Sequence, residues 1–388
     1  MRVLFSTTWG VGHVFPLVPL AKALVAAGHD VLWVTNEQAC PHVTAAGLDA
    51  VPAGLDRAGV TEAEQRMRAV AVDLLPQQRA AYAFPTMFGE GATPTMVRDL
   101  LPIARDWQPD LMVHEPAEHA SALIGAVLDV PSLTQSFGGA VPAPILNDAG
   151  ERLRGLWEEH GQPLPPYAGQ FVAPYLDICP PSVQTVPIDH VAIRQPLRAV
   201  AWTGPPGQPL PPCLTADDPR PMVYVTLGTV SNKSPVLAAA VAGIAEADVR
   251  VLVTVGPDGN PEALGKQPEN VTVERWVDQS TALPHCSIVV SHGGSGTFLG
   301  ALALGLPQLC LPQAADQFRN TLGAERIGAG LGIPPEAMTQ ESVGAAVARL
   351  LSDGKFRAAA ASVAEEIRAM PSPGDVVPML ENLAAAQH

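Results

Sequence analysis

Short apolar runs alternate with longer amphipathic stretches along most of the chain. The first apolar run predicts a strand over 2–6, followed by a turn at 7–13 and a helix over 17–27. Residues 31–34 are the first residues of the next predicted strand. This order predicts a β-α-β unit whose first turn lies at the ligand-binding edge of a parallel sheet.

The same alternation continues through the first half and begins again at Met222. Apolar, β-branched runs predict strands over 110–114, 131–136, 222–227, 249–255, 271–277, 287–291 and 307–311. Helical patterns lie between them over 121–128, 234–245, 280–285, 298–304, 316–328, 340–351 and 356–370. Alternation in both halves predicts an α/β protein with two doubly wound, Rossmann-like domains that face each other across a cleft. Ligands are then expected at the carboxyl ends of the strands.

Prolines interrupt this pattern between the two halves. They are dense over 140–220, and the run 204–212 has the composition of a linker. The predicted domain organisation is an N-terminal domain at 1–203, a proline-rich linker at 204–220, a C-terminal domain at 221–370 and a last segment at 371–388.

Composition and charge exclude several classes of protein. Of the 388 residues, 47% are hydrophobic and 16% are charged, which is typical of a globular protein. The formal net charge of −15 disfavours nucleic acid and acidic membrane surfaces as partners. No apolar run approaches the roughly 18 to 20 residues that span a bilayer, and we find no secretory h-region. The five cysteines are scattered without metal-ligand spacing, so we expect a cytoplasmic protein without a metal site.

The stretch 287–297 has the layout of an anion site, because a strand ends there in a turn that opens a helix. Glycines in the turn would let a bulky anion approach the backbone N–H groups. These glycines are Gly293, Gly294 and Gly296. The candidate side-chain donors are His292, Ser295 and Thr297. A phosphate or diphosphate is the natural ligand, and the alternative is a tight turn whose glycines only ease packing.

A histidine and a glutamate follow two strands of the first half. His13 could act as a general base on a hydroxyl, because the ordinary pKa of imidazole is about 6.5. Glu115 could hold this imidazole and stabilise its charged form. The alternatives are a helix cap for His13 and a solvated loop acid for Glu115. We expect His114 to be structural and assign no role to His119.

Two residue pairs lie at strand ends in the second half. Trp276 could stack on a planar base while Val277 offers its backbone to the base edge, or Trp276 could be a core or rim residue. Asp316 and Gln317 suit the hydroxyl groups of a sugar, because Asp accepts hydrogen bonds and Gln both donates and accepts them. Asp316 could also be a helix N-cap.

Six ordered motifs are together far more specific than any one of them. They are Gly10–His13, His114–Pro116, Tyr224–Thr229, Arg275–Val277, Ser291–Thr297 and Pro312–Gln317. With these motifs the chain resembles, essentially end to end, the inverting UDP-glycosyltransferase superfamily (glycosyltransferase family 1). Within it the chain looks like the bacterial natural-product glycosyltransferases that decorate antibiotics.

The resemblance implies a GT-B fold, with the acceptor held by the first domain and a nucleotide sugar, usually dTDP-linked, by the second. It implies that His13 is the general base and that Glu115 stands where the family often has Asp. The last helix, over 375–385, would cross back to the first domain. The donor-binding residues implied are Gly228, Thr229, Trp276, Val277, His292, Gly294, Ser295, Gly296, Thr297, Asp316 and Gln317.

The mechanism implied is a single displacement with inversion, in which the acceptor hydroxyl attacks the anomeric carbon. Neither a metal ion nor another cofactor is implied, since a helix start and His292 stand where a cation would otherwise be. Aromatic side chains in the first half, Trp157 and Tyr175 among them, favour an aromatic or polyketide aglycone. The acceptor-binding candidates are Gly12, Phe84, Phe88 and Phe137, although a cluster of this kind is more often core.

Two other functions stay open at this point. A nucleotide-sugar epimerase on the same fold would need several cleft carboxylates and no acceptor. A non-catalytic sugar-nucleotide-binding subunit would not depend on His13. The sequence also leaves a homodimer open.

Overall fold

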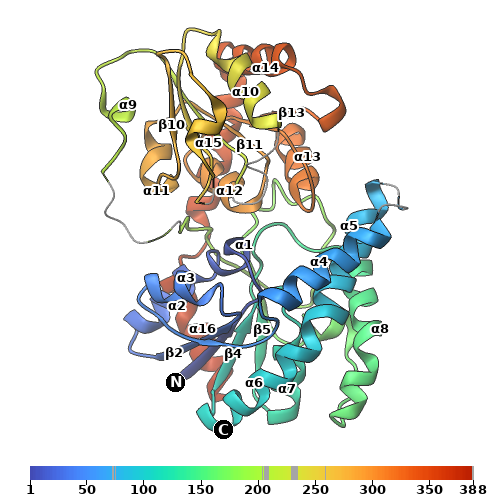
Figure 1. Cartoon of the computed structure of the whole chain (residues 1–388). Helices are drawn as coiled ribbons and strands as arrows, with labels where there is room; N and C mark the ends of the chain where they lie inside the picture. Colours follow the sequence, from blue (N-terminus) through green and yellow to red (C-terminus); the bar gives the residue numbers. More distant parts are fainter. Residues whose placement is uncertain are drawn as a thin grey trace. The chain divides into compact units, whose positions relative to one another are not determined.

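The computed structural model describes residues 1–71, 74, 76–202, 204, 209–228, 235–257 and 259–386. The chain forms two compact units (Figure 1). The first unit comprises Met1–Cys179, Val186–Arg198 and Met370–His388, and the second comprises Pro180–Thr185 and Ala199–Ala369. This division differs from the predicted boundary at 203, because residues 180–185 and 199–369 belong to the second unit and residues 370–388 to the first.

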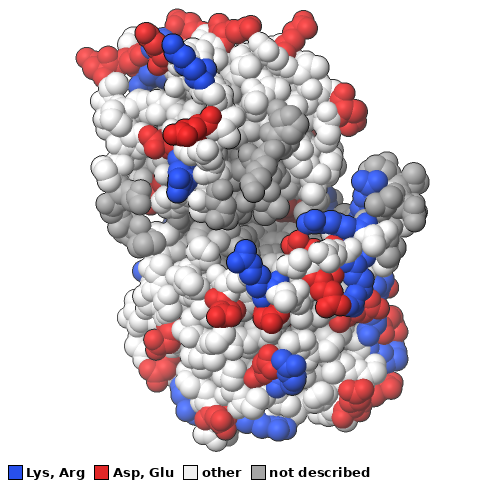
Figure 2. Space-filling view, viewed as in Figure 1, with Lys and Arg blue, Asp and Glu red and all other residues white. Residues whose placement is uncertain are grey.

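Charged side chains of both signs are mixed on the surface. On the face that Figure 2 shows, the described Lys and Arg residues lie among Asp and Glu residues, without a continuous basic area. The prediction that nucleic acid is not a partner rests on the net charge of −15 and stays a prediction.

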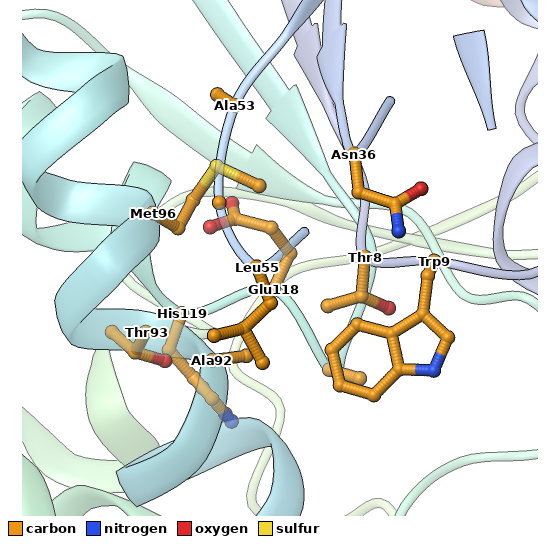
Figure 3. A pocket seen from close by; sticks show the side chains of 12 residues that line it. Thr8, Trp9, Asn36, Ala53, Leu55, Ala92, Thr93, Met96, Glu118 and His119 are labelled. Carbon is orange, nitrogen blue, oxygen red and sulfur yellow. The ribbon is translucent and has the colours of Figure 1, made fainter. Parts of the chain in front are cut away.

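The first unit contains a parallel sheet of five strands in the order β3-β2-β1-β4-β5. The strands are β1 (Arg2–Ser6), β2 (Asp30–Thr35), β3 (Asp49–Pro52), β4 (Leu111–His114) and β5 (Ser132–Thr134). Ser6 pairs with Val34 on one side and with His114 on the other, so the carboxyl ends of three strands lie side by side. A small pocket lies just beyond these strand ends (Figure 3).

Helices connect these strands and pack against the sheet. They are α1 (Val11–Val14), α2 (Val18–Ala26), α3 (Cys40–Ala45), α4 (Arg57–Ala71), α5 (Pro76–Phe84), the π-helix η1 (Pro85–Ala92), α6 (Thr93–Trp107), α7 (Ala120–Leu128), α8 (Ala143–Glu159) and the 3₁₀ turn η2 (Pro166–Gly169). Leu4, Met112, Leu123 and Leu100 meet in one buried cluster between the sheet and α6 and α7. Two short strands, β6 (Tyr175–Asp177) and β7 (Arg194–Pro196), form a separate parallel pair.

The C-terminal helix α16 (Pro373–Ala385) packs on α2 in the first unit. Val376 and Leu380 of α16 are buried. Near its end, Nε2 of His29 lies 2.9 Å from Oε1 of Glu381. The last residues of the chain therefore help to build the unit that contains its first residues.

The second unit contains a parallel sheet of six strands in the order β10-β9-β8-β11-β12-β13. The strands are β8 (Met222–Thr226), β9 (Arg250–Thr254), β10 (Val271–Glu274), β11 (Ile288–Ser291), β12 (Gln308–Cys310) and β13 (Gly330–Gly332). Ser291 pairs with Thr226 on one side and with Cys310 on the other. The segments that follow these three strands are therefore neighbours at one edge of the sheet.

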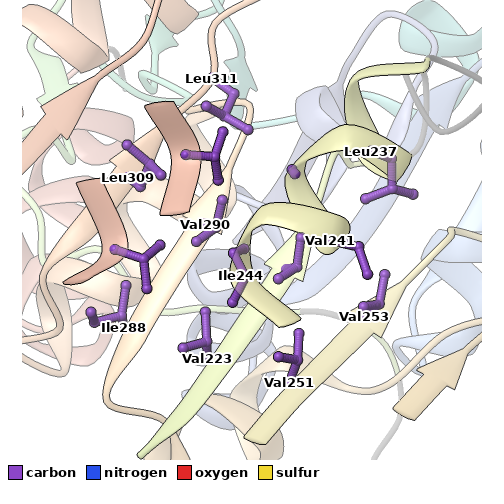
Figure 4. Close-up of a cluster of buried hydrophobic side chains, with 14 of the residues drawn as sticks. Val223, Leu237, Val241, Ile244, Val251, Val253, Ile288, Val290, Leu309 and Leu311 are labelled. Atoms are coloured by element: carbon purple, nitrogen blue, oxygen red, sulfur yellow. The ribbon is translucent and has the colours of Figure 1, made fainter. Parts of the chain in front are cut away.

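The helices of the second unit cover this sheet. They are α9 (Pro212–Thr215), α10 (Pro235–Ala245), η3 (Pro261–Leu264), α11 (Gln279–Ala282), η4 (Leu283–His285), α12 (Ser295–Ala303), α13 (Gln317–Ile327), η5 (Pro335–Ala337), α14 (Gln340–Ser352) and α15 (Gly354–Ala369). Figure 4 shows Val241 and Ile244 of α10 on the side of Val223, Val251 and Val253 of the sheet, and Leu237 belongs to the same buried cluster. Continuous β-branched runs are typical of such parallel strands, because both faces are buried.

Several elements differ from the sequence predictions. The proline-dense stretch contains the 17-residue helix α8, whose prolines Pro142 and Pro144 lie at the N-cap and in the first turn, where a missing N–H is tolerated. The short strands β3 and β13 and the π-helix η1 were not predicted. The helix after β11 begins at Ser295 and not at Phe298, so Ser295–Thr297 form its first turn.

Candidate active site

His13 and Glu115 are brought together in the first unit because they follow the adjacent strands β1 and β4. Gly10 adopts a positive φ of 98°, which lets the chain turn directly from β1 into α1. Nδ1 of His13 lies 3.1 Å from Oε1 of Glu115. The His13 side chain is 22% exposed, whereas the Glu115 side chain is fully buried. The pair therefore consists of a buried carboxylate and an imidazole that reaches the surface.

Glu115 is held on both of its carboxylate oxygens. Thr8 donates to Oε1 from its backbone N–H at 3.1 Å and from its hydroxyl at 2.8 Å, and Ala117 N–H donates to Oε2 at 2.5 Å. Burial alone would raise the pKa of Glu115, but the attraction of His13 and these hydrogen bonds outweigh it and lower the pKa. The carboxylate is therefore ionised at neutral pH.

His114, next to Glu115, is buried and makes contacts of another kind. Its Nδ1 lies 3.3 Å from the Glu115 carbonyl oxygen, and its Nε2 lies 3.5 Å from the hydroxyl oxygen of Thr134. Burial lowers the pKa of His114 to about 4, so the ring is neutral at ordinary pH. These contacts agree with the structural role expected from the sequence.

Aromatic side chains surround His13. The Phe88 ring centroid lies 5.4 Å from that of His13, and the Phe137 centroid lies 5.1 Å from it. Phe84 packs edge-on against Phe88 at 5.2 Å. Gly12 is exposed in α1, immediately before His13. The structure thus gathers the predicted acceptor-binding residues beside His13.

Two other aromatic residues of the first half belong to the core instead. Trp157 is 2% exposed and packs in the cluster between sheet and helices, and Tyr175 is also 2% exposed. Neither side chain lines a surface near His13, so the predicted contribution of Trp157 and Tyr175 to an acceptor surface is wrong. Aromatic composition alone does not separate a core residue from a binding residue.

The glycine-rich turn after β11 leads into α12 in the second unit. Gly293 has a positive φ of 79°, and Gly294 is the N-cap of α12 with an extended conformation. The Gly294 carbonyl accepts from Phe298 N–H, so the helix ladder starts there. The backbone N–H groups of the first turn thus carry the partial positive charge of a helix start.

His292 lies against two glycines at this edge. A Cβ atom added to Gly228 would lie 2.6 Å from His292 Cε1, and one added to Gly294 would lie 2.4 Å from Nε2. Burial lowers the pKa of His292, opposed by the charge of Asp316. Its Nδ1 is buried and has no hydrogen-bond partner within the described residues. A neutral ring with a buried polar atom is therefore fixed beside the helix start.

Ser295 and Asp316 form a hydrogen-bonded group with Asn320. The Ser295 hydroxyl donates to Oδ2 of Asp316 at 2.6 Å. Nδ2 of Asn320 lies 3.1 Å from that oxygen, 3.1 Å from the Ser295 hydroxyl and 2.9 Å from the Gly293 carbonyl oxygen. Asp316 occupies the N-cap position of α13 but makes no capping bond with its side chain. Its carboxylate instead faces the start of α12.

Gln317 and Thr297 are also held in place. Oε1 of Gln317 accepts from the N–H groups of Gln313 at 2.7 Å and Ala314 at 2.9 Å. The Thr297 hydroxyl donates to Oε1 of Gln279 at 3.1 Å. Contacts within the protein thus fix the positions of these polar side chains at this edge of the sheet.

Trp276 and Val277 follow β10 rather than ending it. Val277 is 7% exposed and packs among apolar side chains that include Tyr224, so its side chain is core. Trp276 is half-buried, and its ring lies 3.6 Å from the position of a Cβ at Gly204. Thr229, another predicted donor-binding residue, lies outside the described residues.

Comparisons with known proteins support one family along the whole chain. Residues 22–228 match the N-terminal domain, and residues 238–383 the C-terminal domain, of the "Erythromycin biosynthesis protein CIII-like" family. The chain belongs to this CIII-like family. It is a glycosyltransferase with the GT-B fold, as the predicted resemblance implied.

Similar proteins were found both by sequence and by structure. L-demethylnoviosyl transferase of Streptomyces niveus is 34% identical over 100% of this chain and 98% of its own. Aklavinone 7-beta-L-rhodosaminyltransferase of Streptomyces galilaeus is 32% identical over 100% of this chain and 96% of its own. The crystal structure of glycosyltransferase VinC in complex with dTDP is 26% identical and superposes with a TM-score of 0.83 over 100% of both chains. The predicted assignment to the antibiotic glycosyltransferases is thereby confirmed.

Three residues that hydrogen-bond the predicted site residues were not predicted from the sequence. Thr8 holds Glu115, Asn320 holds both Ser295 and Asp316, and Gln279 holds Thr297. One signal was available for Asn320, which lies one helical turn after Asp316 and so shares its face of α13. The others come from tertiary contacts that no local pattern reveals.

Metal-ligating groups and membrane-crossing helices were also sought in this glycosyltransferase. Among the described residues, no three His, Cys, Asp or Glu side chains lie together as a metal site requires. The expectation that it works without a metal or cofactor stays a prediction. Within the same residues, every helix is too short or too polar to cross a membrane.

Proposed function

We propose that this protein transfers a sugar from a nucleoside diphosphate sugar, dTDP-linked, to a hydroxyl group of an apolar aromatic or polyketide aglycone, with inversion at the anomeric carbon. The observation that carries the proposal is the 3.1 Å contact between His13 Nδ1 and Glu115 Oε1. A carboxylate that accepts from Nδ1–H leaves the proton-accepting lone pair on Nε2. That nitrogen would take the proton of the acceptor hydroxyl.

In the proposed reaction the acceptor oxygen attacks the anomeric carbon as its proton passes to His13. The bond from this carbon to the diphosphate oxygen breaks, and the diphosphate leaves with the bonding electrons. Glu115 would stabilise the imidazolium that forms, because its carboxylate is ionised and buried beside the ring. One displacement of this kind inverts the anomeric centre.

The donor would bind to the second unit. The N-terminus of α12 and His292 would hold the diphosphate and stabilise its charge as it leaves, and no metal ion is proposed. Trp276 would stack on the base, the Val277 backbone would meet the base edge, and Asp316 and Gln317 would bind sugar hydroxyls. Related structures support a thymidine nucleotide, since VinC and the spinosyn rhamnosyltransferase SpnG were each crystallised with thymidine diphosphate.

The acceptor would bind beside His13 in the first unit. Phe84, Phe88 and Phe137 supply apolar surface there, and Gly12 leaves the start of α1 open. A structure of SpnG with spinosyn aglycone is among the similar structures and supports an aglycone in this class. The epimerase and the non-catalytic subunit are not favoured, because the named relatives are sugar transferases.

The test is transfer itself, run in both directions. The protein is incubated with dTDP-sugars and a panel of aromatic and polyketide aglycones, and with dTDP or UDP and glycosylated natural products, and products are identified by mass spectrometry. The anomeric configuration of a product is then read by NMR. If no nucleotide sugar or glycoside is formed under any combination, the proposed function fails.

The role of His13 is tested separately with a matched control. His13→Ala should lower kcat by about 10²–10⁴-fold, which is the usual contribution of a general base. His160, on the C-terminal end of α8, bonds a backbone carbonyl within its own helix, so His160→Ala should leave kcat unchanged. Activity of His13→Ala within a factor of about two of the unaltered protein would remove His13 from the mechanism.

A further inference from the structure

The Ser295 hydroxyl in the first turn of α12 has its only proton engaged within the protein. It donates to Oδ2 of Asp316 at 2.6 Å. A serine hydroxyl carries one O–H, so in this arrangement Ser295 has no proton left for a phosphate oxygen. The structure thus gives this hydroxyl a partner other than the phosphate that the sequence pattern suggested.

Asn320 of α13 holds the same carboxylate oxygen. Its Nδ2 lies 3.1 Å from Oδ2 of Asp316 and 3.1 Å from the Ser295 hydroxyl oxygen. An amide oxygen in this place would face a carboxylate, so the neighbours identify the atom as the NH₂ group. Both Ser295 and Asn320 are buried. Two buried donors on different helices therefore fix one oxygen of Asp316.

The other carboxylate oxygen of Asp316 is open. Among the residues that the structure describes, none donates a hydrogen bond or forms an ion pair with Oδ1. The Asp316 side chain is also partly exposed, so a ligand can reach it. Because Oδ2 is tied on two sides, Oδ1 has a defined direction in which it can accept a hydrogen bond.

The same amide group also holds the glycine-rich turn before α12. Nδ2 of Asn320 lies 2.9 Å from the carbonyl oxygen of Gly293, which has a positive φ of 79°. One side chain thus connects the turn at the proposed diphosphate site with Asp316, the proposed sugar contact. In a nucleotide sugar the anomeric carbon is bonded directly to the diphosphate, so a fixed spacing between these two sites favours binding of both parts at once.

We infer that Ser295 and Asn320 are positioning residues for the donor sugar, which hold Oδ2 of Asp316 so that Oδ1 accepts a hydrogen bond from a sugar hydroxyl. This role rests on the proposed function for the identity of the ligand as a nucleotide sugar. Ser295 then acts on the sugar through Asp316, and the diphosphate is left to the backbone N–H groups and His292. Loss of the Ser295 hydroxyl should therefore weaken only the part of donor binding that the sugar contributes.

The test compares dTDP with dTDP-glucose, a probe whose sugar ring carries several free hydroxyl groups. Isothermal titration calorimetry measures both Kd values for the full chain and for Ser295→Ala, since alanine is well tolerated in a helix. The Kd for dTDP-glucose should rise about tenfold, because Asp316 loses a hydrogen bond that fixes its carboxylate. The Kd for dTDP should stay within a factor of about two. An equal rise for both nucleotides, or no rise for dTDP-glucose, overturns the inference.

A double-mutant cycle assigns the effect to Asp316. In an Asp316→Ala background, Ser295→Ala should change the Kd for dTDP-glucose by less than about twofold, because the carboxylate that it positions is gone. A rise of the same size in both backgrounds overturns the inference. Ser362→Ala is the matched control, because exposed Ser362 bonds only the Ala358 carbonyl within α15. It should leave both Kd values unchanged.

Asn320→Ala tests the second positioning residue. The variant removes the bond to Asp316 and also the bond to the Gly293 carbonyl, so both Kd values should rise, and that for dTDP-glucose should rise more. An unchanged Kd for dTDP-glucose removes Asn320 from this role. Because Asn320 is buried, circular dichroism first checks that the variant is folded, and Ser295→Ala carries the test if it is not.

Failure of these roles and failure of the proposed function give different results. A selective loss of dTDP-glucose binding in Ser295→Ala that depends on Asp316 supports the roles even if no sugar is transferred, and the absence of transfer then counts against the proposed function alone. An equal loss for both nucleotides overturns the roles even if transfer is observed. Binding of neither nucleotide by the unaltered protein contradicts both.

Discussion

Gly294 lies so close to His292 that its missing side chain makes room for the imidazole. A Cβ atom at position 294 would lie 2.4 Å from His292 Nε2, although the φ of −64° and ψ of 142° at Gly294 suit any residue. Glycine is therefore required there for space and not for backbone conformation. Gly228 makes a second close approach, since a Cβ atom there would lie 2.6 Å from His292 Cε1.

We predict that Gly294→Ala weakens dTDP binding by displacing His292. An Ala Cβ at this distance forces the ring to move, and we expect the Kd for dTDP to rise by about tenfold, or about 1.4 kcal/mol. Isothermal titration calorimetry measures the change. The same substitution in a His292→Ala background should cost less than about twofold, because the ring it displaces is gone.

Comparing Gly294→Ala in the unaltered protein and in the His292→Ala background also distinguishes displacement of the imidazole from unfolding of the protein. Circular dichroism and a thermal melt should show Gly294→Ala folded, since only a side-chain neighbour is affected. An equal loss of dTDP binding in both backgrounds would contradict the proposed link between Gly294 and His292.

Much of the fold followed from local pattern. β-Branched runs predicted the inner strands, and glycine turns predicted where they end, because parallel strands and their turns depend on neighbouring residues. The placement of His13 beside Glu115 also followed, once both were assigned to strand ends of one sheet. Ser6 pairs with His114 in the sheet, so the segments that follow β1 and β4 are neighbours and bring His13 next to Glu115.

The remaining features depend on tertiary contacts. The tie between Thr8 and Glu115 joins residues 107 positions apart, and the pocket residues Asn36 and His119 follow different strands. Helix α8 was not predicted, because the high proline content of this stretch suggested a loop. Composition does not show that the prolines of α8 lie only at its N-terminal end, where a helix tolerates them. No sequence period marks such residues, so only packing identifies them.

Glu115→Gln should lower kcat while leaving dTDP affinity unchanged. The variant removes the charge that would stabilise a protonated His13, and its NH₂ group must face a donor, either Thr8 or Ala117 N–H. We expect kcat to fall at least about tenfold but less than in His13→Ala. Steady-state kinetics and dTDP titration measure both quantities. A fall in dTDP affinity with unchanged kcat would contradict the assignment of Glu115 to the His13 pair.

Glu118 should make the stability of the protein depend on pH. Burial raises its pKa from about 4.5 to about 7, despite hydrogen bonds from Ser121 and Ala120. The folded state therefore binds more protons than the unfolded state between these two values, and stability falls as pH rises through that window. The loss at pH 8 relative to pH 4 amounts to about 3 kcal/mol.

Comparison with Glu118→Gln isolates this effect. The lowered pKa values of His114 and His119 change stability in the opposite direction, but they do so in both proteins and cancel in the difference. Urea unfolding at several pH values should show the unaltered protein losing stability relative to the variant as the pH rises. A difference that does not change between pH 4 and pH 8 would show that Glu118 titrates normally.

Leu380→Ala should destabilise the first unit through the C-terminal helix. Leu380 is fully buried in α16, which packs on α2, so the cavity should cost about 2–5 kcal/mol in the free energy of unfolding. The adjacent change Glu381→Gln is the control, because this carboxylate is 48% exposed and its contact with His29 should contribute less than about 1 kcal/mol. Urea unfolding gives both values, and dTDP binding should be unchanged, because the proposed donor residues lie in the second unit. Equal stabilities for the two variants would mean that α16 is not part of the cooperative core of the first unit.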